Sequence, residues 1–273
     1  MQNKRIKAAL AIAAGLAVPF YLIAPGKATK RQKAPFNGRN IAHRGLHSRD
    51  RQIPENSLAA FKLATEAGYG VELDVQLSKD GQVVVFHDDT LDRVCGVHAR
   101  VEDLNYSELR ELSLCGSGEG IPLFTDVLNI VKGRGPIICE LKNGKRNKEL
   151  CEKTYAIISD YSGEICIESF NPMIVAWFRF HAPDLLRGQL ACTAKDYNGE
   201  VSKPASIILS NLLLNFLARP QFVAYKIGRK SLTVRIANRL GAMRFCWTSH
   251  EPRNEKGNDC VIFEFYKPGI FYK

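Results

Sequence analysis

The sequence predicts an α/β fold, a TIM-like (β/α)8 barrel with a small insertion and an N-terminal apolar helix. The length of 273 residues suits one such barrel, because α/β barrels often reach about 250 residues as a single domain. Hydrophobic residues make up 45% of the chain, which is enough for a sizeable core. From Asn40 onward, short strand-like runs alternate with segments of helical period, which is typical of parallel strands joined by crossover helices.

Nine runs have the composition of strands, one more than a barrel needs. They are residues 40–44, 71–76, 83–87, 136–141, 165–169, 187–191, 222–226 and 244–248, with 260–265 left over. The sequence does not indicate which eight close the barrel. Helices are expected at 57–67, 107–113, 124–132, 147–160, 172–180 and 231–240, and Asn56 and Ser57 can cap the first. An apolar helix at 206–219 is expected to pack on the barrel, or to face a membrane or a substrate tail.

The chain divides into an apolar N-terminal segment with a basic linker (1–33) and the barrel (34–273), which carries an insertion at about 95–120. Residues 8–24 form an uninterrupted apolar run of 17 residues. We expect this run to anchor the protein to a membrane without cleavage, with a cleaved signal peptide and a packed soluble helix as alternatives. Basic residues flank the run on both sides, so the sequence does not predict which side of the membrane the barrel faces.

The net charge of +10 is unevenly distributed. Residues 1–33 carry seven Lys or Arg and no acid, whereas the other 240 residues carry 31 basic and 28 acidic side chains. No basic stripe is interleaved with aromatic residues, so nucleic-acid binding is not expected. The eight cysteines are dispersed without a CxxC pair, which indicates buried thiols in a reducing compartment more than zinc or redox chemistry.

Polar residues interrupt four of the predicted strands at or near their ends. Charges inside apolar strands are costly unless they are paired or metal-bound, and the C-terminal ends of barrel strands are where active sites form. The residues concerned are His43, Arg44 and Gly45; Glu72 and Asp74; His87 and Asp88; and Glu140 and Lys142.

The spacing of the acidic residues predicts a metal site. Glu72 and Asp74 are two positions apart on one strand, so both point to the same side and repel each other. A divalent cation is the simplest way to hold them together, and Glu140 can supply a third oxygen ligand. We expect one Mg²⁺ or Ca²⁺, since the set contains no thiolate for zinc. The alternative for the Glu-x-Asp pair alone is the solvent face of an edge strand.

The Asp80-Gly81 pair predicts a tight hairpin between the second and third strands. A two-residue loop would place Asp74 opposite His87, and hence an imidazole beside the carboxylates, whereas a three-residue loop would shift this pairing by one residue. A phosphodiester could then be cleaved if a metal, Arg44 and Lys142 neutralise its charge while His43 and His87 act as base and acid. His98, His181 and His250 are expected to be structural.

At these residues the chain resembles the glycerophosphodiester phosphodiesterase family of the phospholipase-C-like phosphodiesterase superfamily. The matching stretches are AHRG (42–45), PENSLAAF (54–61), VELDVQLSKDGQVVVFHDDTLDR (71–93), IPLFTDVL (121–128), CELK (139–142), ESFNP (168–172) and CWT (246–248). The resemblance implies a TIM-like barrel that hydrolyses glycerophosphodiesters to glycerol 3-phosphate and an alcohol. It also implies metal ligands at Glu72, Asp74 and Glu140, catalytic histidines at His43 and His87, and substrate contacts from Arg44, Lys142 and Trp247.

The chain departs from the family pattern in two places. Members often have a Thr-Asp pair before the last proline and a Val-Asn near the seventh strand, whereas this chain reads IFEFYKP (262–268) and AYK (224–226). These departures leave the glycerol or leaving-group specificity open. A phospholipase acting on lyso or intact phospholipids and a non-catalytic lipid-headgroup binding barrel are therefore retained as alternatives. The leaving-group alcohol and the oligomeric state are not predicted.

Overall fold

The computed structural model describes residues 18–273, so most of the apolar run at 8–24 lies outside the described residues. Residues 18–23 are helical and lead into α2 (Lys30–Lys33). Within the described residues, no helix has both the length and the apolar character needed to cross a bilayer. The predicted N-terminal anchor lies mostly outside the described residues and stays a prediction.

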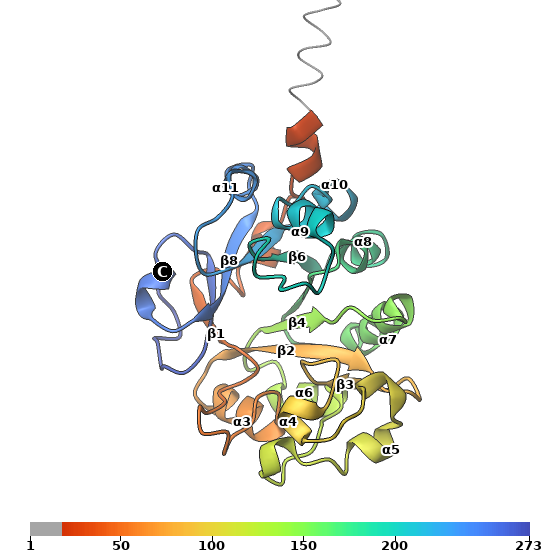
Figure 1. The fold of residues 1–273 in the computed structure, drawn as a ribbon. Coiled ribbons are helices and arrows are strands. Elements are labelled where there is room, and N and C mark those ends of the chain that lie inside the picture. The colour runs from red at the N-terminus through yellow and green to blue at the C-terminus, as the bar shows by residue number, and fades with distance from the viewer. Residues whose placement is uncertain (1–17) are drawn as a thin grey trace, which may run out of the picture.

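Eight parallel strands in residues 18–273 close into a barrel, as predicted (Figure 1). The order around the barrel is β1-β9-β8-β7-β6-β5-β4-β2, and pairing of β1 with β2 closes it. The strands are β1 (Arg39–Ala42), β2 (Gly70–Leu77), β4 (Ile137–Leu141), β5 (Ile165–Ser169), β6 (Leu186–Ala191), β7 (Phe222–Lys226), β8 (Met243–Ser249) and β9 (Cys260–Phe263).

The extra strand is β3 (Val83–Val85), which runs antiparallel to β2, whereas the run at 260–265 closes the barrel as β9. Residues 78–82 are too few for a crossover helix, so the chain turns straight back. Ser78 N donates to Gln82 O (3.0 Å), and Gly81 adopts a φ of +77°. Val75 pairs with Val85, and Phe86 N donates to Asp74 O (3.0 Å). The predicted two-residue hairpin is therefore wrong, because the longer loop shifts the register by one residue and puts Phe86, not His87, opposite Asp74.

Most helices lie within two residues of their predicted bounds. Ser57 caps the first helix, since its side chain accepts a hydrogen bond from Ala60 N (3.1 Å). The helices around the barrel are α3 (Leu58–Glu66), α6 (Phe124–Val131), α7 (Asn147–Ser159), α8 (Pro172–His181) and α11 (Leu232–Arg239).

The predicted single helix at 206–219 is wrong. The chain forms α9 (Lys203–Ser210) and α10 (Asn215–Ala218), separated by a turn in which Leu212 has a φ of +57°. The turn buries the Leu212 side chain among Val223, Tyr225 and Val234, a contact that a straight helix would not make.

Residues 86–123 form short elements that pack on their own apolar cluster beside the barrel. These are α4 (Asp92–Cys95), η1 (Val101–Asp103), α5 (Tyr106–Leu109) and η2 (Leu114–Gly116). The helix predicted at 107–113 is thus only the single turn of α5. Val84 and Phe86 belong to the same cluster, so this segment holds the stretch that leads from β3 to His87.

The N-terminal end of the barrel is filled by aromatic side chains. Phe222 and Phe245 stack with ring centroids 4.1 Å apart, and Phe36, just after α2, packs on Phe245 at 6.1 Å. A Cβ on Gly188 would lie 1.9 Å from the Phe222 ring, so only glycine fits there. Glu72 and Asp74 on β2 and Glu140 on β4 lie nearer the other end, where the parallel strands finish.

Candidate active site

Three buried carboxylates converge inside the C-terminal end of the barrel. Glu72 and Asp74 lie on β2, and Glu140 lies on β4 in register with Asp74. One ligand oxygen of each lies within 4.8 Å of the others, and the residues are 2%, 1% and 7% exposed. The structure therefore brings together the three residues that the sequence predicted as metal ligands.

Two cations partly balance these carboxylates. Lys142 Nζ lies 2.9 Å from Glu140 Oε1 and 3.4 Å from Asp74 Oδ1. Arg44 Nε lies 3.5 Å from Asp74 Oδ2, and the Arg44 backbone N–H donates to Glu72 Oε2 (2.9 Å). Burial alone would lower the pKa of both cations, but the surrounding carboxylates hold each pKa above its usual value.

The charges on the cluster are still out of balance. Burial, reinforced by Asp74 and Glu140, raises the pKa of Glu72 well above its usual value, and burial also raises the pKa of Glu140. The pKa of Asp74 is lowered, because His87, Lys142 and Arg44 together outweigh its burial. Asp74 Oδ1 accepts no hydrogen bond from any residue in 18–273. A cation between three carboxylate oxygens would correct this imbalance, and an all-oxygen set suits Mg²⁺ or Ca²⁺.

His43 follows β1 and is held by a carboxylate from the opposite end of the sequence. Its Nδ1 lies 2.8 Å from Glu264 Oε2, just after β9, and its Nε2 lies 3.9 Å from Glu72 Oε2. Burial and then Arg44 lower the pKa of His43, while bonding to His43 brings the pKa of Glu264 to about 2 despite burial. A charged Glu264 therefore fixes the ring, and Nε2 is directed toward the carboxylates.

His87 is held in a similar way by its neighbour Asp88. His87 Nδ1 lies 2.6 Å from Asp88 Oδ1, and Arg93 Nε lies 2.6 Å from Asp88 Oδ2. The Gln76 side chain donates to Phe86 O (2.8 Å) and Asp88 O (2.9 Å), the carbonyls on either side of His87. His87 thus reaches the barrel mouth on the returning strand of a hairpin, although the predicted register is wrong.

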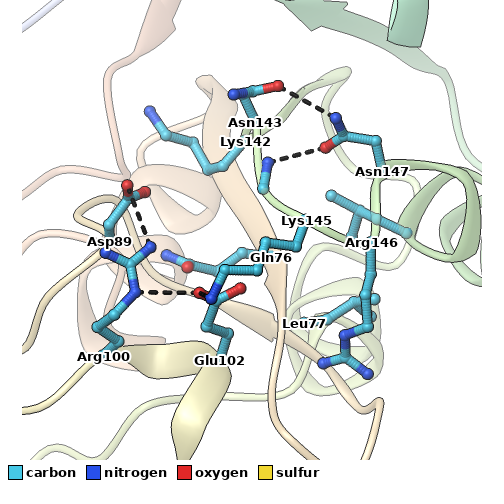
Figure 2. A pocket seen from close by; sticks show the side chains of 12 residues that line it. Gln76, Leu77, Asp89, Arg100, Glu102, Lys142, Asn143, Lys145, Arg146 and Asn147 are labelled. Carbon is cyan, nitrogen blue, oxygen red and sulfur yellow. Dashed lines mark hydrogen bonds and ion pairs between the residues drawn. The ribbon is translucent and has the colours of Figure 1, made fainter. Parts of the chain in front are cut away.

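Two cavities flank Lys142. The larger, about 590 Å³, includes His87, Glu140 and Lys142 and extends to Phe170, Tyr197 and Leu209, and so joins the charged centre to an apolar wall. Figure 2 shows the smaller pocket of about 30 Å³, where Gln76 and Asp89 lie near Lys142 and Arg100 pairs with Asp89 and Glu102. Of the two cavities beside Lys142, the larger offers room for a substrate.

Trp247 lies on the barrel wall beside the larger cavity. Its ring packs against Phe170 with centroids 5.9 Å apart, and its indole N–H donates to Ala224 O (3.3 Å). Phe170 in turn contacts Tyr197 at 6.1 Å. Trp247 therefore supports the aromatic wall through Phe170, and its assignment to substrate binding stays a prediction.

Four residues of the centre were not identified from the sequence. Glu55 accepts from both Arg44 (2.7 Å) and Arg93 (2.6 Å), and so links the two histidine-bearing loops. Asn56 donates to Asp74 Oδ2 (2.8 Å). Both lie in the stretch PENS, from which the sequence predicts a helix cap at Asn56 and Ser57 and no role for Glu55. Glu264 is the third such residue. Its partners His43 and His250 lie 221 and 14 positions away in the sequence, so no short motif connects them.

The fourth is Glu168 on β5, in register with Glu140. It is 1% exposed, and its Oε2 has no hydrogen-bond partner within residues 18–273. Burial, with Glu140 and Asp74, raises the pKa of Glu168 well above its usual value. The sequence pattern that identifies Glu168 is an acidic residue at the end of an apolar strand, as at Glu140.

Comparison with known proteins agrees with this geometry. The Glycerophosphoryl diester phosphodiesterase family matches residues 43–267. A Glycerophosphodiester phosphodiesterase from Caldanaerobacter subterraneus subsp. tengcongensis is 36% identical over 162 residues, which cover 55% of this chain and 65% of that protein. Lysophospholipase D GDPD1 of Homo sapiens is 32% identical over 148 residues, which cover 50% of this chain and 45% of that protein.

The fold is also similar to that of solved glycerophosphodiester phosphodiesterases. A glycerophosphodiester phosphodiesterase from Parabacteroides distasonis superimposes with a TM-score of 0.64 at 26% identity, covering 84% of this chain and 93% of that chain. The chain spans less than two thirds of the length of the two curated relatives named above. The family match, by contrast, extends over nearly the whole barrel and includes all the converging site residues. The chain belongs to the glycerophosphoryl diester phosphodiesterase family.

Proposed function

We propose that this protein is a metal-dependent phosphodiesterase that hydrolyses glycerophosphodiesters to glycerol 3-phosphate and an alcohol. The observation that carries the proposal is the convergence of Glu72, Asp74 and Glu140 between two carboxylate-held histidines. Family membership and the names of the relatives support the same reaction. A divalent cation bound by the three carboxylates would neutralise a phosphate oxygen and polarise the phosphorus–oxygen bond.

Arg44 and Lys142 are placed to bind the phosphodiester. Both side chains are mostly buried, at 16% and 14% exposure, and both stay charged because their pKa values are raised. If the carboxylates bind a cation, their ion pairs with Arg44 and Lys142 weaken, and these two side chains can then bind the phosphate of the substrate. Arg44 is further fixed by Glu55, which limits its movement.

His43 and His87 are placed to move protons. Each binds a carboxylate through Nδ1, which leaves Nε2 free to face the reacting atoms. The pKa of His43 is lowered, so its neutral form is favoured and it suits the role of base, while His87 suits the role of acid for the leaving alkoxide. Glu264 and Asp88 would stabilise the protonated rings during these steps.

The test is turnover of glycerophosphocholine by His43→Ala and His87→Ala variants, with chelator and cation add-back. Loss of a general acid or base should lower kcat on the order of 10²- to 10⁴-fold. His181→Ala is the matched control, because His181 is exposed at the end of α8 and bonds only a helix carbonyl there. Full activity of either variant would remove that histidine from the mechanism, and full activity in chelator would remove the cation.

A lysophospholipid substrate is the second candidate. It is favoured by the apolar wall of the 590 Å³ cavity, where Phe170 and Leu209 lie beyond the charged centre, and by the name of the human relative. Comparing kcat/KM for glycerophosphocholine and a lysophosphatidylcholine separates the two substrates. A non-catalytic headgroup-binding barrel is the remaining alternative, and cation-dependent turnover of either compound would exclude it.

We also propose that the apolar run at 8–24 tethers the protein to a membrane, so that the barrel works at the bilayer. The support is the run itself and the basic residues on both sides of it. Fractionation of cells that express the full chain tests this. A carbonate-resistant membrane fraction is expected, and recovery of the intact chain in the soluble fraction would contradict the tether.

A further inference from the structure

One half of the barrel carries a surplus of positive charge. Residues 171–243, which include α8 to α11, contain ten Lys or Arg and three Asp or Glu. Residues 34–170 and 244–273 together contain 21 basic and 25 acidic side chains. The small net charge of the barrel therefore conceals two regions of opposite sign. Residues 171–243 contain β6 and β7 of the eight barrel strands with helices α8 to α11, and we call this side of the molecule the basic half.

The basic side chains of this half are largely unpaired. Lys226 with Asp196 (2.8 Å) is the one ion pair that they make with a carboxylate in residues 18–273. Lys203 on α9, Arg229 before α11, and Arg235 and Arg239 on α11 are all exposed. On the opposite half, α3 and α7 instead pair their exposed lysines with acidic neighbours one turn away. These four side chains and Lys195 are exposed and make no ion pair within residues 18–273, so their positive charge is available to a partner, whereas Arg187 is buried.

Exposed apolar side chains lie between these charges. Ile207 on α9 is 55% exposed, and Leu232 and Leu240 at the ends of α11 are 60% and 48% exposed. The two helices adjoin, since Thr233 Oγ1 donates to Asn211 Oδ1 (3.0 Å). In Figure 1, α9, α10 and α11 lie together on the side of the barrel away from α3, α5 and α6. Aliphatic side chains interleaved with arginines are the composition of surfaces that bind lipid interfaces.

The N-terminal helical residues leave the barrel from this same half. Tyr21 packs on Phe216 of α10 with ring centroids 6.2 Å apart, and Arg219 Nη1 donates to Tyr21 O (3.0 Å) and Ala24 O (2.9 Å). Val18 and Phe20 are exposed there. Residues 18–24, the described end of the apolar run at 8–24, therefore pack against the basic half (Figure 1).

We propose that the basic half is a docking surface for an anionic lipid bilayer, and that it binds through charge and through the side chains of α9 and α11. Phosphate headgroups would meet the unpaired Lys and Arg, and the exposed Ile and Leu side chains would enter the interface. The helix α9 also supplies Leu209 to the wall of the 590 Å³ cavity, so docking would bring the cavity close to the lipid. This surface is separate from the catalytic residues and does not depend on the proposed reaction.

Hydrogen–deuterium exchange of the full chain with lipid vesicles tests the proposal. Vesicles of phosphatidylcholine containing 30% phosphatidylglycerol should protect residues 203–210 and 232–239, and 0.5 M salt should reverse that protection. Residues 58–66 of α3 should exchange as before. Equal protection by pure phosphatidylcholine, or no protection of α9 and α11, would overturn the proposal. Protection of α9 and α11 by duplex DNA in the absence of lipid would also overturn the proposal. Protection that rises with protein concentration in the absence of lipid would do so as well, because it would indicate self-association.

A charge variant provides the matched comparison. Arg235→Gln with Arg239→Gln removes two exposed charges from α11, and protection of the unmodified α9 should then need about 30-fold more anionic lipid, given roughly 1 kcal/mol per basic residue. Lys62→Gln with Arg110→Gln removes two exposed charges on the other side of the barrel, one from α3 and one from the C-cap of α5, and it should change the requirement less than threefold. Equal effects of the two double variants would show that the net charge of the protein, and not this surface, attracts the lipid.

Discussion

Replacing Glu72 with Gln should affect stability in opposite directions with and without a cation. Each pair of charged carboxylates in the cluster lies within 4.8 Å, which at an effective dielectric constant of 20 costs about 3.5 kcal/mol or more. Glu72 faces two such neighbours, and Arg44 offsets part of the repulsion. In chelator at pH 7, Glu72→Gln should therefore stabilise the fold by about 2–3 kcal/mol, or roughly 4–12 °C in Tm.

A saturating divalent cation should reverse this order. A ligand present at 1,000 times its Kd adds about 4.1 kcal/mol to the stability of the wild type, which exceeds the advantage of the variant. The variant has lost one ligand and should gain much less. Thermal unfolding of both proteins in EDTA and in Mg²⁺ or Ca²⁺ measures the effect.

Asp74→Asn is the matched control, because the pKa of Asp74 is lowered by its cationic neighbours. Its charged form stabilises the fold, so this substitution should destabilise the metal-free protein. The pH dependence gives a further check. A raised pKa in the folded state costs stability above the unfolded pKa, so the advantage of Glu72→Gln should shrink as the pH falls toward about 4.5. A variant less stable than the wild type in chelator would refute the charge argument.

Three other substitutions follow from the same contacts. Glu264→Gln removes a charge-assisted bond to His43 and should lower kcat about 10- to 150-fold with little change in KM. Steady-state kinetics measures both constants, and a changed KM with an unchanged kcat would contradict this role. The pKa of Glu55 is lowered to about 2, so its stabilising effect should be present above about pH 4.5 and be lost toward pH 2. Urea unfolding should then show Glu55→Gln destabilised at pH 7, with most but not all of that difference lost at pH 2.5. Gly188→Ala should destabilise the barrel by about 1–3 kcal/mol through its clash with Phe222, and Phe222→Leu in the same chain should relieve part of that loss; additive losses would contradict the clash.

Local patterns in the sequence were sufficient to predict the barrel fold and the convergence of the three carboxylates. Strands β5 and β7 coincide with the predicted runs 165–169 and 222–226, because apolar runs buried on both faces are easily recognised. Glu72, Asp74 and Glu140 were identifiable for a related reason. An acidic residue within a buried strand needs a compensating partner, and a two-residue spacing fixes its side.

Features that depend on long-range contacts were missed. The bond between His43 and Glu264 joins residues 221 positions apart, and no local pattern connects them. The register of β3 against β2 depended on a loop that is one residue longer than the Asp-Gly pair suggested. The break within 206–219 depended on burial of Leu212 against strands that come later in the chain. In each case tertiary packing decided between local alternatives.

The central claim is that one divalent cation is held between β2 and β4 within reach of both histidines. Anomalous diffraction from crystals soaked with Mn²⁺ tests it most directly. We expect one strong anomalous peak at bonding distance from carboxylate oxygens of Glu72, Asp74 and Glu140, and no such peak in crystals of Asp74→Asn. A peak elsewhere on the protein, or none at saturating Mn²⁺, would contradict the claim.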